Sequence, residues 1–546
     1  MLSKAASYEE LRSRFRWQLP QRFNIGVAVS DRWAEEDPER IALRYATPGS
    51  ETQLLTFGDL SVQSNRLANL LRVHGVGPGS RIGVLLPQQP ETALAHIAAF
   101  KLGAISIPLF MLFGPEALAY RLSDAGVQAV ITNREGAAKL APLRAELADL
   151  KLVLCTEEGG EGSESLATGM AAQPPQFTPV DTAAEDPALI IYTSGTTGQP
   201  KGALHAHRVL LGHMPGVAMG QDLFPQPGDC FWTPADWAWI GGLLDVLLPS
   251  LYEGVPVVAC RFAKFTGEAT FQLLQDEGIR NAFIPPTALK MMRGVEAPET
   301  RWRYRLRSLA SGGESLGQEL LAWGRKTFDL DINEFYGQTE CNLVVSSCGA
   351  VMPGRPGLMG RAVPGHAVAV VSPEGDPLPE GQLGTIAVKA PDPVMFLGYW
   401  NKPEATQAKY AKGWLLTGDS GIAEGDDWFR FVGRDDDVIT SSGYRIGPGE
   451  IEDCLLGHPA VALAGVIGKP DPLRTEIVKA YIVLAEGTEA SNSLADEIQD
   501  WVKTRLAAHE YPREVAFVEA LPLTTTGKII RRELRKRAEA ELEEKA

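Results

Sequence analysis

Short apolar segments alternate with helix-like segments along the first third of the chain, and this alternation limits the fold more than any other feature. Residues 81–87 have the composition of a buried strand, residues 91–102 that of a helix, and residues 104–108 that of the next strand. Strands joined by helices in this way form parallel sheets that helices cover. The sequence therefore predicts an α/β fold with parallel sheets in a large N-terminal domain.

The chain is too long for a single hydrophobic core, because 546 residues exceed the usual size of one domain. Glycine, proline and short alternating strands dominate residues 353–400, which predicts a small antiparallel, β-barrel-like subdomain. From residue 451 to residue 518, helix and strand signals alternate in a different charge environment. We interpret this last part as a separate small α+β C-terminal domain.

Composition and charge exclude several classes of protein. The formal net charge of −16 argues against a nucleic-acid-binding protein, which needs clustered Lys and Arg. The six cysteines are scattered without a C-x-x-C pair, which argues against a zinc site or a disulfide framework. The longest apolar region, residues 239–260, contains Asp245, Pro249 and Glu253 and does not form a membrane span. The first residues lack the apolar core of a secretory signal, so we expect a cytoplasmic protein.

A hydroxyl- and glycine-rich loop follows the strand-like residues 188–191 and has the features of a phosphate cradle. Its residues are Thr193, Ser194, Gly195, Thr196, Thr197, Gly198, Gln199, Pro200 and Lys201. Glycines let backbone N–H groups approach phosphate oxygens, the hydroxyls add donors, and Lys201 adds a positive charge. The loop is not a P-loop, since that motif needs a glycine where this chain has Pro200. Taken alone, it is equally consistent with an ordinary surface turn.

Further polar residues follow predicted strands, at the edge where open α/β sheets bind ligands. The loop at residues 311–315 is the first example. Thr339 is suited to bonding a phosphate, and Glu340 to binding Mg²⁺, which prefers carboxylate and phosphate oxygens. Asp419 lies in a glycine-bounded turn that suits a ribose diol, and Lys528 lies in a second glycine–lysine loop.

Two groups of residues allow more than one interpretation. His205 and His207 have a spacing that fits a metal ion, but no further ligand cluster is nearby, so we expect a structural role or a place beside the pocket. Trp237 and Trp239 are followed by Gly241 and Gly242. The two indoles belong either to the core or to the wall of an apolar ligand slot.

Five motifs, taken in order, resemble those of the adenylate-forming enzymes. They are residues 193–201, 336–340, 417–419, 433–437 and 527–528. The resemblance extends from about residue 23 to residue 534 and is closest to the medium-chain acyl-CoA synthetases. It implies that a small carboxylic acid attacks the α-phosphate of MgATP, giving an acyl-adenylate and diphosphate. The thiol of coenzyme A (CoA), the co-substrate, then displaces AMP.

The resemblance implies how the chain handles the phosphates and the magnesium ion. Residues 193–201 would bind the β- and γ-phosphates, and Thr339 would contact the α-phosphate. Glu340 and Thr196 would bind Mg²⁺. Lys528, at the position of the family's catalytic lysine, would bridge the acyl carboxylate and the α-phosphate, so Lys528, Thr339 and Glu340 are the expected catalytic residues.

The nucleoside would lie against a second group of residues. Asp419 and Arg434 would hold the ribose hydroxyls. The adenine and the remaining nucleotide atoms would contact Gly313, Glu314, Ser315, Glu334, Phe335, Tyr336, Gly337 and Gln338.

In this family the C-terminal domain moves between the two half-reactions. The chain would accordingly divide into residues 1–434, which bind ATP and the acid, and residues 435–546, a mobile domain that carries Lys528. Asp436 would be the hinge. The resemblance implies CoA contacts from Ser442, Gly443, Tyr444, Arg445, Arg474 and Lys503.

The acid is predicted from glycines in the expected acyl pocket. Acetyl-CoA synthetases, which the chain also resembles, close this pocket with a tryptophan where this chain has Gly337. Two further wall positions are also glycine, and three missing side chains predict a longer slot in which each methylene gains about 0.8 kcal/mol. The residues expected to line the slot are Trp237, Trp239, Ile240, Gly241, Gly312 and Gly337. We therefore expect medium-length, branched or aromatic acids.

Three alternatives stay open. The chain is an acetyl- or propionyl-CoA synthetase, an adenylating enzyme for a non-CoA acceptor, or a binding protein without turnover. The presence of both Lys201 and Lys528 disfavours the last of these. The sequence leaves a homo-oligomer open and offers no nucleic acid or membrane span as a partner.

Overall fold

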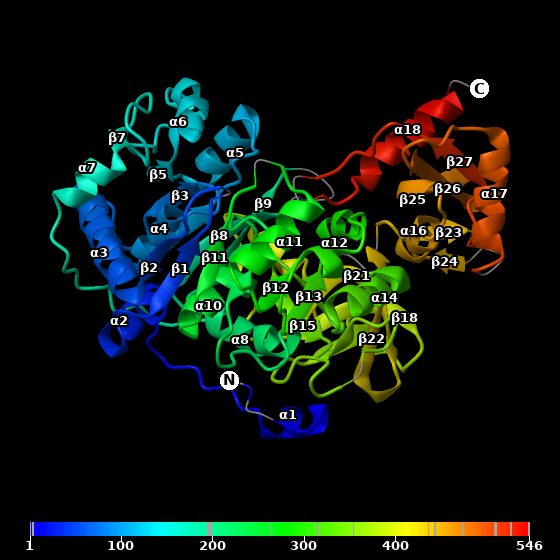
Figure 1. Cartoon of the computed structure of the whole chain (residues 1–546), viewed down its shortest axis with the longest axis horizontal. Coiled ribbons are helices and arrows are strands. Elements are labelled where there is room, and N and C mark those ends of the chain that lie inside the picture. The colour runs from blue at the N-terminus through cyan, green and yellow to red at the C-terminus, as the bar shows by residue number, and fades with distance from the viewer. Residues whose placement is uncertain are drawn as a thin grey trace.

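Three sheets organise the computed structural model, which describes residues 2, 5–47, 49–193, 199–262, 264–313, 316–352, 354–434, 436–441, 444–471, 474–506, 510–524 and 527–543. Figure 1 shows the last sheet and its helices as a separate lobe at one end of the molecule. The predicted fold class is confirmed: parallel α/β sheets form a large N-terminal part, and a smaller mixed domain follows. Within these residues no helix combines the length and apolar character needed to cross a membrane.

The first sheet has eight strands in the order β19-β9-β8-β4-β3-β5-β6-β7. All neighbours from β8 to β7 pair in parallel, whereas β9 turns back antiparallel to β8. The bounds are β3 Arg81–Leu85, β4 Ile105–Pro108, β5 Ala129–Thr132, β6 Leu152–Cys155, β7 Glu164–Ser165, β8 Pro187–Thr193, β9 Lys201–Ala206 and β19 Gly398–Tyr399. The strands predicted at residues 81–87 and 104–108 are thus β3 and β4.

Helices cover both faces of this sheet because its strands are apolar on both faces. On β5, Ile131 packs into the cluster that contains helices α3 and α4, while Val130 packs into the cluster that contains α5. The helices of this region are α1 Tyr8–Arg14, α2 Arg32–Glu36, α3 Phe57–Val73, α4 Pro90–Lys101, α5 Pro115–Ala125, α6 Arg134–Leu140 and α7 Leu166–Ala171, with the π-helical turn η1 Val27–Asp31 and the 3₁₀ turn η2 Ala141–Leu143.

The second sheet joins a parallel half to an antiparallel half. Strands β11, β10, β12, β13 and β14 pair in parallel, and from β14 onward the pairing is antiparallel. Two of the short strands predicted within residues 353–400 are the antiparallel pair β17–β18. The bounds are β1 Ile41–Tyr45, β2 Gln53–Thr56, β10 Phe231–Trp232, β11 Val257–Ala259, β12 Asn281–Phe283, β13 Ser308–Gly312, β14 Ile332–Gln338, β15 Cys341–Ser346, β16 Gly360–Ala362, β17 Val368–Val371, β18 Leu383–Lys389, β20 Tyr410–Ala411, β21 Trp414–Glu424 and β22 Trp428–Arg434.

The helices that follow β9 pack between and around the two large sheets. They are α8 Val209–Gly220, α9 Ile240–Gly242, α10 Leu248–Tyr252, α11 Gly267–Asp276, α12 Pro286–Arg293, α13 Pro298–Arg301, α14 Gly317–Phe328 and α15 Pro403–Gln407, with the π-helical turn η3 Leu243–Leu247 and the 3₁₀ turn η4 Gly425–Asp427.

The C-terminal domain has its own five-stranded sheet and its own apolar core. The long strands β25 Val461–Asp471 and β26 Thr475–Leu484 form its centre. The remaining elements are β23 Ile439–Ser441, β24 Tyr444–Ile446, β27 Glu514–Phe517, α16 Pro448–Leu456, α17 Asn492–Lys503 and α18 Arg531–Glu543.

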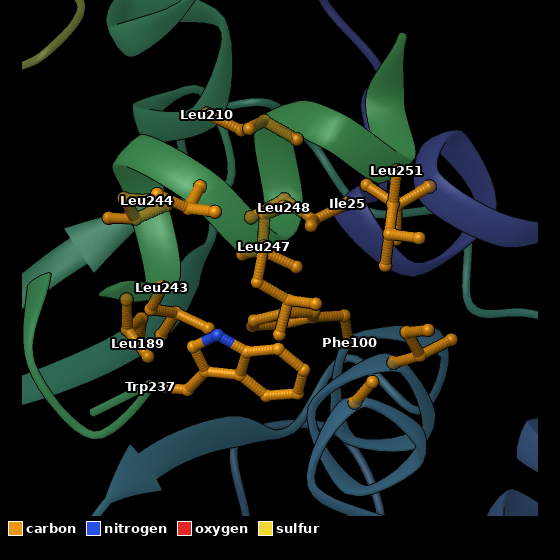
Figure 2. Close-up of a cluster of buried hydrophobic side chains, with 14 of the residues drawn as sticks. Ile25, Phe100, Leu189, Leu210, Trp237, Leu243, Leu244, Leu247, Leu248 and Leu251 are labelled. Carbon is orange, nitrogen blue, oxygen red and sulfur yellow. The ribbon is translucent and has the colours of Figure 1, made fainter. Parts of the chain in front are cut away.

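One apolar cluster joins the two large sheets. Figure 2 shows its centre, where Trp237 lies beside Leu189 of the first sheet and beside the η3–α10 segment. Leu247 and Leu248 of this segment are both fully buried. Because both sheets contribute to the same cluster, we expect the N-terminal part to lose stability as a unit when this cluster is damaged.

Leu248→Ala tests this arrangement. Removing a fully buried leucine side chain is expected to lower the free energy of unfolding by about 2–5 kcal/mol, through lost burial and the cavity that remains. Denaturant unfolding measures the change. Val73→Ala is the matched control, since Val73 is 71% exposed and its loss should change stability by less than about 0.5 kcal/mol. Equal losses in the two variants would contradict the arrangement.

Candidate active site

Residues from both domains meet at one edge of the second sheet. Strands β10, β12, β13 and β14 run in parallel, so their carboxyl ends share this edge. Figure 1 shows the segment before α18 reaching from the C-terminal lobe toward the N-terminal part. A Cβ on Gly527 would lie 3.3 Å from Thr287 at the start of α12. The C-terminal domain therefore places its glycine–lysine loop against the N-terminal part.

Lys528 extends from this loop to the sheet edge. Its ammonium lies 6.0 Å from the ring centroid of Trp239. A Cβ on Gly313, the residue after β13, would lie 3.7 Å from the Lys528 Nζ atom. Gly313 has a φ of +97°, which favours glycine, and its missing side chain leaves room for the lysine. The geometry thus brings together Lys528, Gly313 and Trp239, to which the sequence gave separate roles.

A network of hydrogen bonds holds the Asp419 carboxylate. The Tyr336 hydroxyl donates to Asp419 Oδ2 at 2.6 Å, and the Gln338 amide donates to the same oxygen at 3.2 Å. Arg434 Nη1 lies 3.3 Å from Asp419 Oδ1, because the two residues face each other across β21 and β22. The network brings together four residues that the sequence assigned to nucleotide binding.

Burial raises the pKa of the Asp419 carboxyl, and the Arg434 guanidinium is the largest opposing influence. Asp419 is 4% exposed, whereas the Arg434 side chain is 42% exposed. The buried carboxylate offers a hydrogen-bond acceptor to a ligand, and the exposed guanidinium beside it offers hydrogen-bond donors. This pair is suited to holding vicinal hydroxyls.

Glu340 is also buried, and it has a partner that the sequence did not indicate. The Tyr399 hydroxyl donates to Glu340 Oε1, and the Lys201 ammonium lies 5.1 Å from the centroid of the Tyr399 ring. Tyr399 thus connects the end of the phosphate-loop candidate to the carboxylate. Burial raises the pKa of the Tyr399 hydroxyl, with the Glu340 charge as a further cause, so the hydroxyl stays a donor. Thr339, between Gln338 and Glu340, is half-buried.

The phosphate-loop candidate joins the antiparallel strands β8 and β9. Thr193 pairs with Lys201, which brings the two ends of the loop together. The Tyr120 hydroxyl of α5 donates to the carbonyl oxygen of Pro200 at 2.9 Å and anchors the end of the loop. Gln199 and Pro200 are described as well. Ser194, Gly195, Thr196, Thr197 and Gly198 lie outside the described residues, as do Glu314 and Ser315 of the 311–315 loop.

The arrangement around Glu340 fits a magnesium ion that ATP would bring. Glu340 is 7% exposed and has a carboxylate oxygen beside the Tyr399 hydroxyl. Among the described residues no group of three His, Cys, Asp or Glu side chains forms a self-sufficient metal site. Mg²⁺ is commonly held by one or two carboxylates together with substrate phosphates, and a single buried carboxylate suits this mode.

The adenine candidates lie on β14 and near it. Burial raises the pKa of the Glu334 carboxyl to about 7, and the backbone N–H of Leu316 lies 3.4 Å from this carboxylate. Phe335 packs against Phe283 of β12, with ring centroids 5.0 Å apart. Phe283 in turn lies 5.9 Å from Trp239. These three rings form an aromatic wall at the sheet edge. The sequence analysis named Trp239 and Phe335 as site candidates but missed Phe283.

The glycine argument for a long acyl slot is corrected at two of its three positions. A Cβ on Gly337 would collide with the backbone nitrogen of Leu343 and lie 2.7 Å from the Cα of Asn342. A Cβ on Gly312 would lie 2.7 Å from the Phe335 carbonyl oxygen. Both glycines are required by close backbone approach, so their missing side chains do not by themselves lengthen a slot. At Gly241 the three atoms nearest a Cβ would be ring atoms, of Phe283 at 2.9 Å and of Trp239 at 3.3 Å.

The assignment of Trp237 to the acyl slot is also corrected. Trp237 is fully buried in the cluster that joins the two large sheets, as Figure 2 shows. Ile240 is 3% exposed and belongs to the same cluster. Only Trp239 is half-buried, and it faces Lys528. Of the two interpretations of the tryptophans, Trp237 therefore follows the core interpretation, while Trp239 remains a candidate for the wall.

The burial of His205 and His207 fits a structural role, which is one of the two roles that the sequence suggested. Both are completely buried, and the backbone N–H of Ile25 donates to His207 Nδ1 at 3.2 Å. Burial lowers the pKa of His205 to about 3 and that of His207 to about 4. Neutral, buried imidazoles of this kind support the packing of β9.

The candidates for CoA binding belong to the C-terminal domain. Tyr444 and Arg445 lie on β24, while Ser442 and Gly443 are outside the described residues. Arg474 directly precedes β26, and its N–H donates to Asp471 at 2.8 Å. Lys503 ends α17, with its ammonium 5.4 Å from the Tyr511 ring centroid.

Asp436, the predicted hinge, lies between β22 and the C-terminal sheet. Its carboxylate is 3.8 Å from Arg434 Nε, and its carbonyl oxygen accepts from Arg535 of α18 at 3.0 Å. The residue thus contacts the last strand of the N-terminal part and a helix of the C-terminal domain.

Comparison with known proteins agrees with this geometry. The family model described as AMP-binding enzyme matches residues 30–400, and the model of its C-terminal domain matches residues 450–528. The chain belongs to the AMP-binding enzyme family, whose members are adenylate-forming. Within that family it is an AMP-forming acyl-CoA ligase of the acyl-CoA synthetase group.

Two relatives and one solved structure illustrate the range of this group. The acetyl-coenzyme A synthetase of Bacillus subtilis (strain 168) is 34% identical, over 97% of this chain and 94% of the relative. The mitochondrial acyl-coenzyme A synthetase ACSM4 of Mus musculus is also 34% identical, over 95% and 91%. The crystal structure of the anthranilate CoA ligase AuaEII with anthranoyl-AMP superposes with a TM-score of 0.88 at 27% identity, over 96% of this chain and 99% of that one.

Gly337→Ala tests the corrected role of this glycine. Because the new Cβ would collide with backbone atoms of residues 342 and 343, we expect a loss of about 1–3 kcal/mol in the free energy of unfolding. Thermal and denaturant unfolding measure it. Gly77→Ala is the control, since a Cβ there has nothing within 4 Å. A Gly337→Ala protein as stable as the control would restore the open-slot interpretation.

Proposed function

We propose that this protein activates a carboxylic acid larger than acetate as its acyl-adenylate and transfers the acyl group to CoA. Residues 1–434 would bind ATP and the acid, and residues 435–546 would form the mobile domain. We propose a cytoplasmic enzyme, following the expectation from the sequence. The proposal rests above all on the position of Lys528, whose ammonium lies close to Gly313 and Trp239 at the carboxyl edge of the second sheet.

In the first half-reaction the residues would act mainly by position and charge. Asp419 and Arg434 would hold the ribose, with the nucleotide phosphates directed toward Thr339 and Lys201. Glu340 would hold the magnesium ion, with Thr196 as a second candidate, and the ion would neutralise phosphate charge. Lys528 would hold the acyl carboxylate and an α-phosphate oxygen together while the new acyl–phosphate bond forms and diphosphate leaves.

In the second half-reaction the C-terminal domain would turn about Asp436 and withdraw Lys528. The CoA thiolate would then attack the acyl carbonyl carbon, and AMP would leave with the bonding electrons. Residues of the C-terminal domain would contact CoA at this stage. They are Ser442, Gly443, Tyr444, Arg445, Arg474 and Lys503.

The aromatic wall supports an acid larger than acetate. Trp239, Phe283 and Phe335 follow one another at centroid distances of 5.9 and 5.0 Å, and Trp239 is only half-buried. Phe283 and Phe335 are buried behind Trp239, at 1% and 9% exposure, so an apolar or aromatic acyl group would gain from burial against the Trp239 ring. The second candidate function is a synthetase that prefers acetate or propionate. The similarity to an acetyl-coenzyme A synthetase is the reason to retain it.

A ladder of acids tests the substrate class. AMP release is measured with MgATP and acids from acetate to decanoate, plus benzoate, each with and without CoA. We expect CoA-dependent AMP formation with a maximum beyond acetate, since each buried methylene contributes about 0.8 kcal/mol. A maximum at acetate would support the second candidate. Diphosphate release that CoA does not stimulate would indicate another acceptor.

Two substitutions test the division of labour between the domains. Asp436→Pro fixes φ at the hinge, so adenylation should persist while thioester formation falls. Lys528→Met should show the opposite pattern, with acid-dependent ATP–diphosphate exchange reduced roughly 100- to 1,000-fold. Both variants are compared in that exchange and in thioester formation from synthetic acyl-adenylate. Equal loss of both half-reactions in the Asp436→Pro variant would contradict the hinge.

A further inference from the structure

A lysine outside every motif recognised in the sequence contacts the network around Asp419. Lys409 lies between α15 and β20, and its carbonyl oxygen accepts from the backbone N–H of Leu416 at 2.7 Å. Its half-buried side chain donates to the carbonyl oxygen of Thr417 at 3.0 Å and to Gln338 Oε1 at 3.2 Å. The Lys409 ammonium is therefore bound to the carbonyl oxygen of Thr417, two residues before Asp419 in β21. The Gln338 side chain lies between this ammonium and the Asp419 carboxylate.

The contact with Lys409 reinforces the orientation of the Gln338 amide, which two acceptors hold from its nitrogen side. An amide has one acceptor atom and one donor group, and an ammonium can meet only the acceptor. With its oxygen on Lys409, Gln338 turns its nitrogen toward the Thr417 carbonyl oxygen at 2.9 Å and toward Asp419 Oδ2 at 3.2 Å. Without the ammonium the amide oxygen would lose this partner, and the two acceptors on the nitrogen alone would hold the amide in this orientation.

We propose that Lys409 is a positioning residue for adenylation, which acts by orienting the Gln338 amide and thereby fixing Asp419 and the strand end that carries Thr339. The inference rests on the proposed function, because it gives Asp419 the ribose hydroxyls and Thr339 the α-phosphate. In this proposal Lys409 contacts neither the ribose hydroxyls nor the α-phosphate. Its effect is exerted through two hydrogen bonds, one to a side chain and one to the backbone of β21.

Lys409 also contributes to the charge balance at Asp419. Burial raises the pKa of the Asp419 carboxyl, and four groups from surrounding elements lower it: Arg434 of β22, Tyr336 of β14, Lys409, and Lys528 of the loop before α18. Removing the Lys409 charge raises this pKa further. Because the ionised carboxylate is the form that accepts from the ribose, activity in the variant would fall off at a higher pH than in the wild type.

The experiment compares three variants of the full-length protein. Lys409→Met removes the cation, and Lys409→Arg keeps a cation with N–H donors. Lys412→Met is the matched control, because Lys412 lies three residues away, is 57% exposed and pairs with Asp376. Acid-dependent ATP–diphosphate exchange gives kcat and KM for ATP between pH 5 and 9. Thioester formation from synthetic acyl-adenylate reports the second half-reaction.

We expect Lys409→Met to lower kcat/KM for ATP roughly 10- to 100-fold in the exchange, the value of a hydrogen bond to a charged group. Most of the loss should lie in KM, and the acid limb of the pH profile should move to higher pH. Thioester formation should stay near wild type, and Lys409→Arg should regain most of the exchange. A Gln338→Leu, Lys409→Met double variant should lose less than the product of the single losses.

Several results would overturn the inference. A Lys409→Met enzyme that matches Lys412→Met would do so, as would equal loss of both half-reactions with no rescue by arginine. An acid limb that stays at the wild-type pH in Lys409→Met would contradict the claim that the Lys409 charge lowers the pKa of Asp419. If the wild-type protein shows no exchange with any acid, the proposed function fails, and equilibrium dialysis of MgATP then tests Lys409 separately. Unchanged MgATP affinity in Lys409→Met would overturn its role, and weakened affinity would support it.

Discussion

The buried carboxylate of Asp419 is the interaction on which the site depends. Tyr336 and Gln338 reach it from β14, at the end of the parallel half of the second sheet, and Arg434 reaches it from β22 in the antiparallel half. A charge at 4% exposure is stable only when it is well paired, so the two halves of the sheet must keep their register for the carboxylate to keep its partners. The nucleotide candidates are therefore held by the same interactions that join the two halves.

The second element of the site comes from a different domain. Lys528 reaches Trp239 and Gly313 only because the loop before α18 lies against α12. Its charge already contributes to the environment of Asp419, since it lowers the pKa of that carboxyl. Any movement that withdraws Lys528 therefore changes the charge balance around the nucleotide as well as the acyl contact. The position of Lys528 and the pKa of the Asp419 carboxyl would change together, so a single movement would affect both the acyl contact and the nucleotide site.

Sequence reasoning predicted the features that are local in the chain. The β3–α4–β4 alternation and the position of Gly313 directly after β13 follow from short-range patterns that a strand or a turn imposes. Asp419 was expected in a glycine-bounded turn but lies within the long strand β21, next to Gly418, whose φ is +75°. Tyr399 and Lys409 were missed because their partners are 59 and 71 residues away, and a single tyrosine or lysine between elements carries no pattern of its own. Trp237 and Gly337 were misjudged for a different reason. A residue type states neither which face it occupies nor whether a missing side chain leaves space or is filled by a neighbouring backbone.

The close contacts at Gly312 and Gly337 have a consequence for how such an enzyme diversifies. Both positions lie on strands whose neighbouring backbone is too close to admit a side chain. A single substitution there would therefore impair folding, whatever its effect on substrate preference. Gly241 and Trp239 lie on the helical side, at the start of α9, where the three atoms nearest a Cβ on Gly241 belong to aromatic rings. Lineages that keep this backbone would therefore accumulate their changes in acyl range on the helical side, one tolerated step at a time. The strand side would change only together with a shift of the main chain.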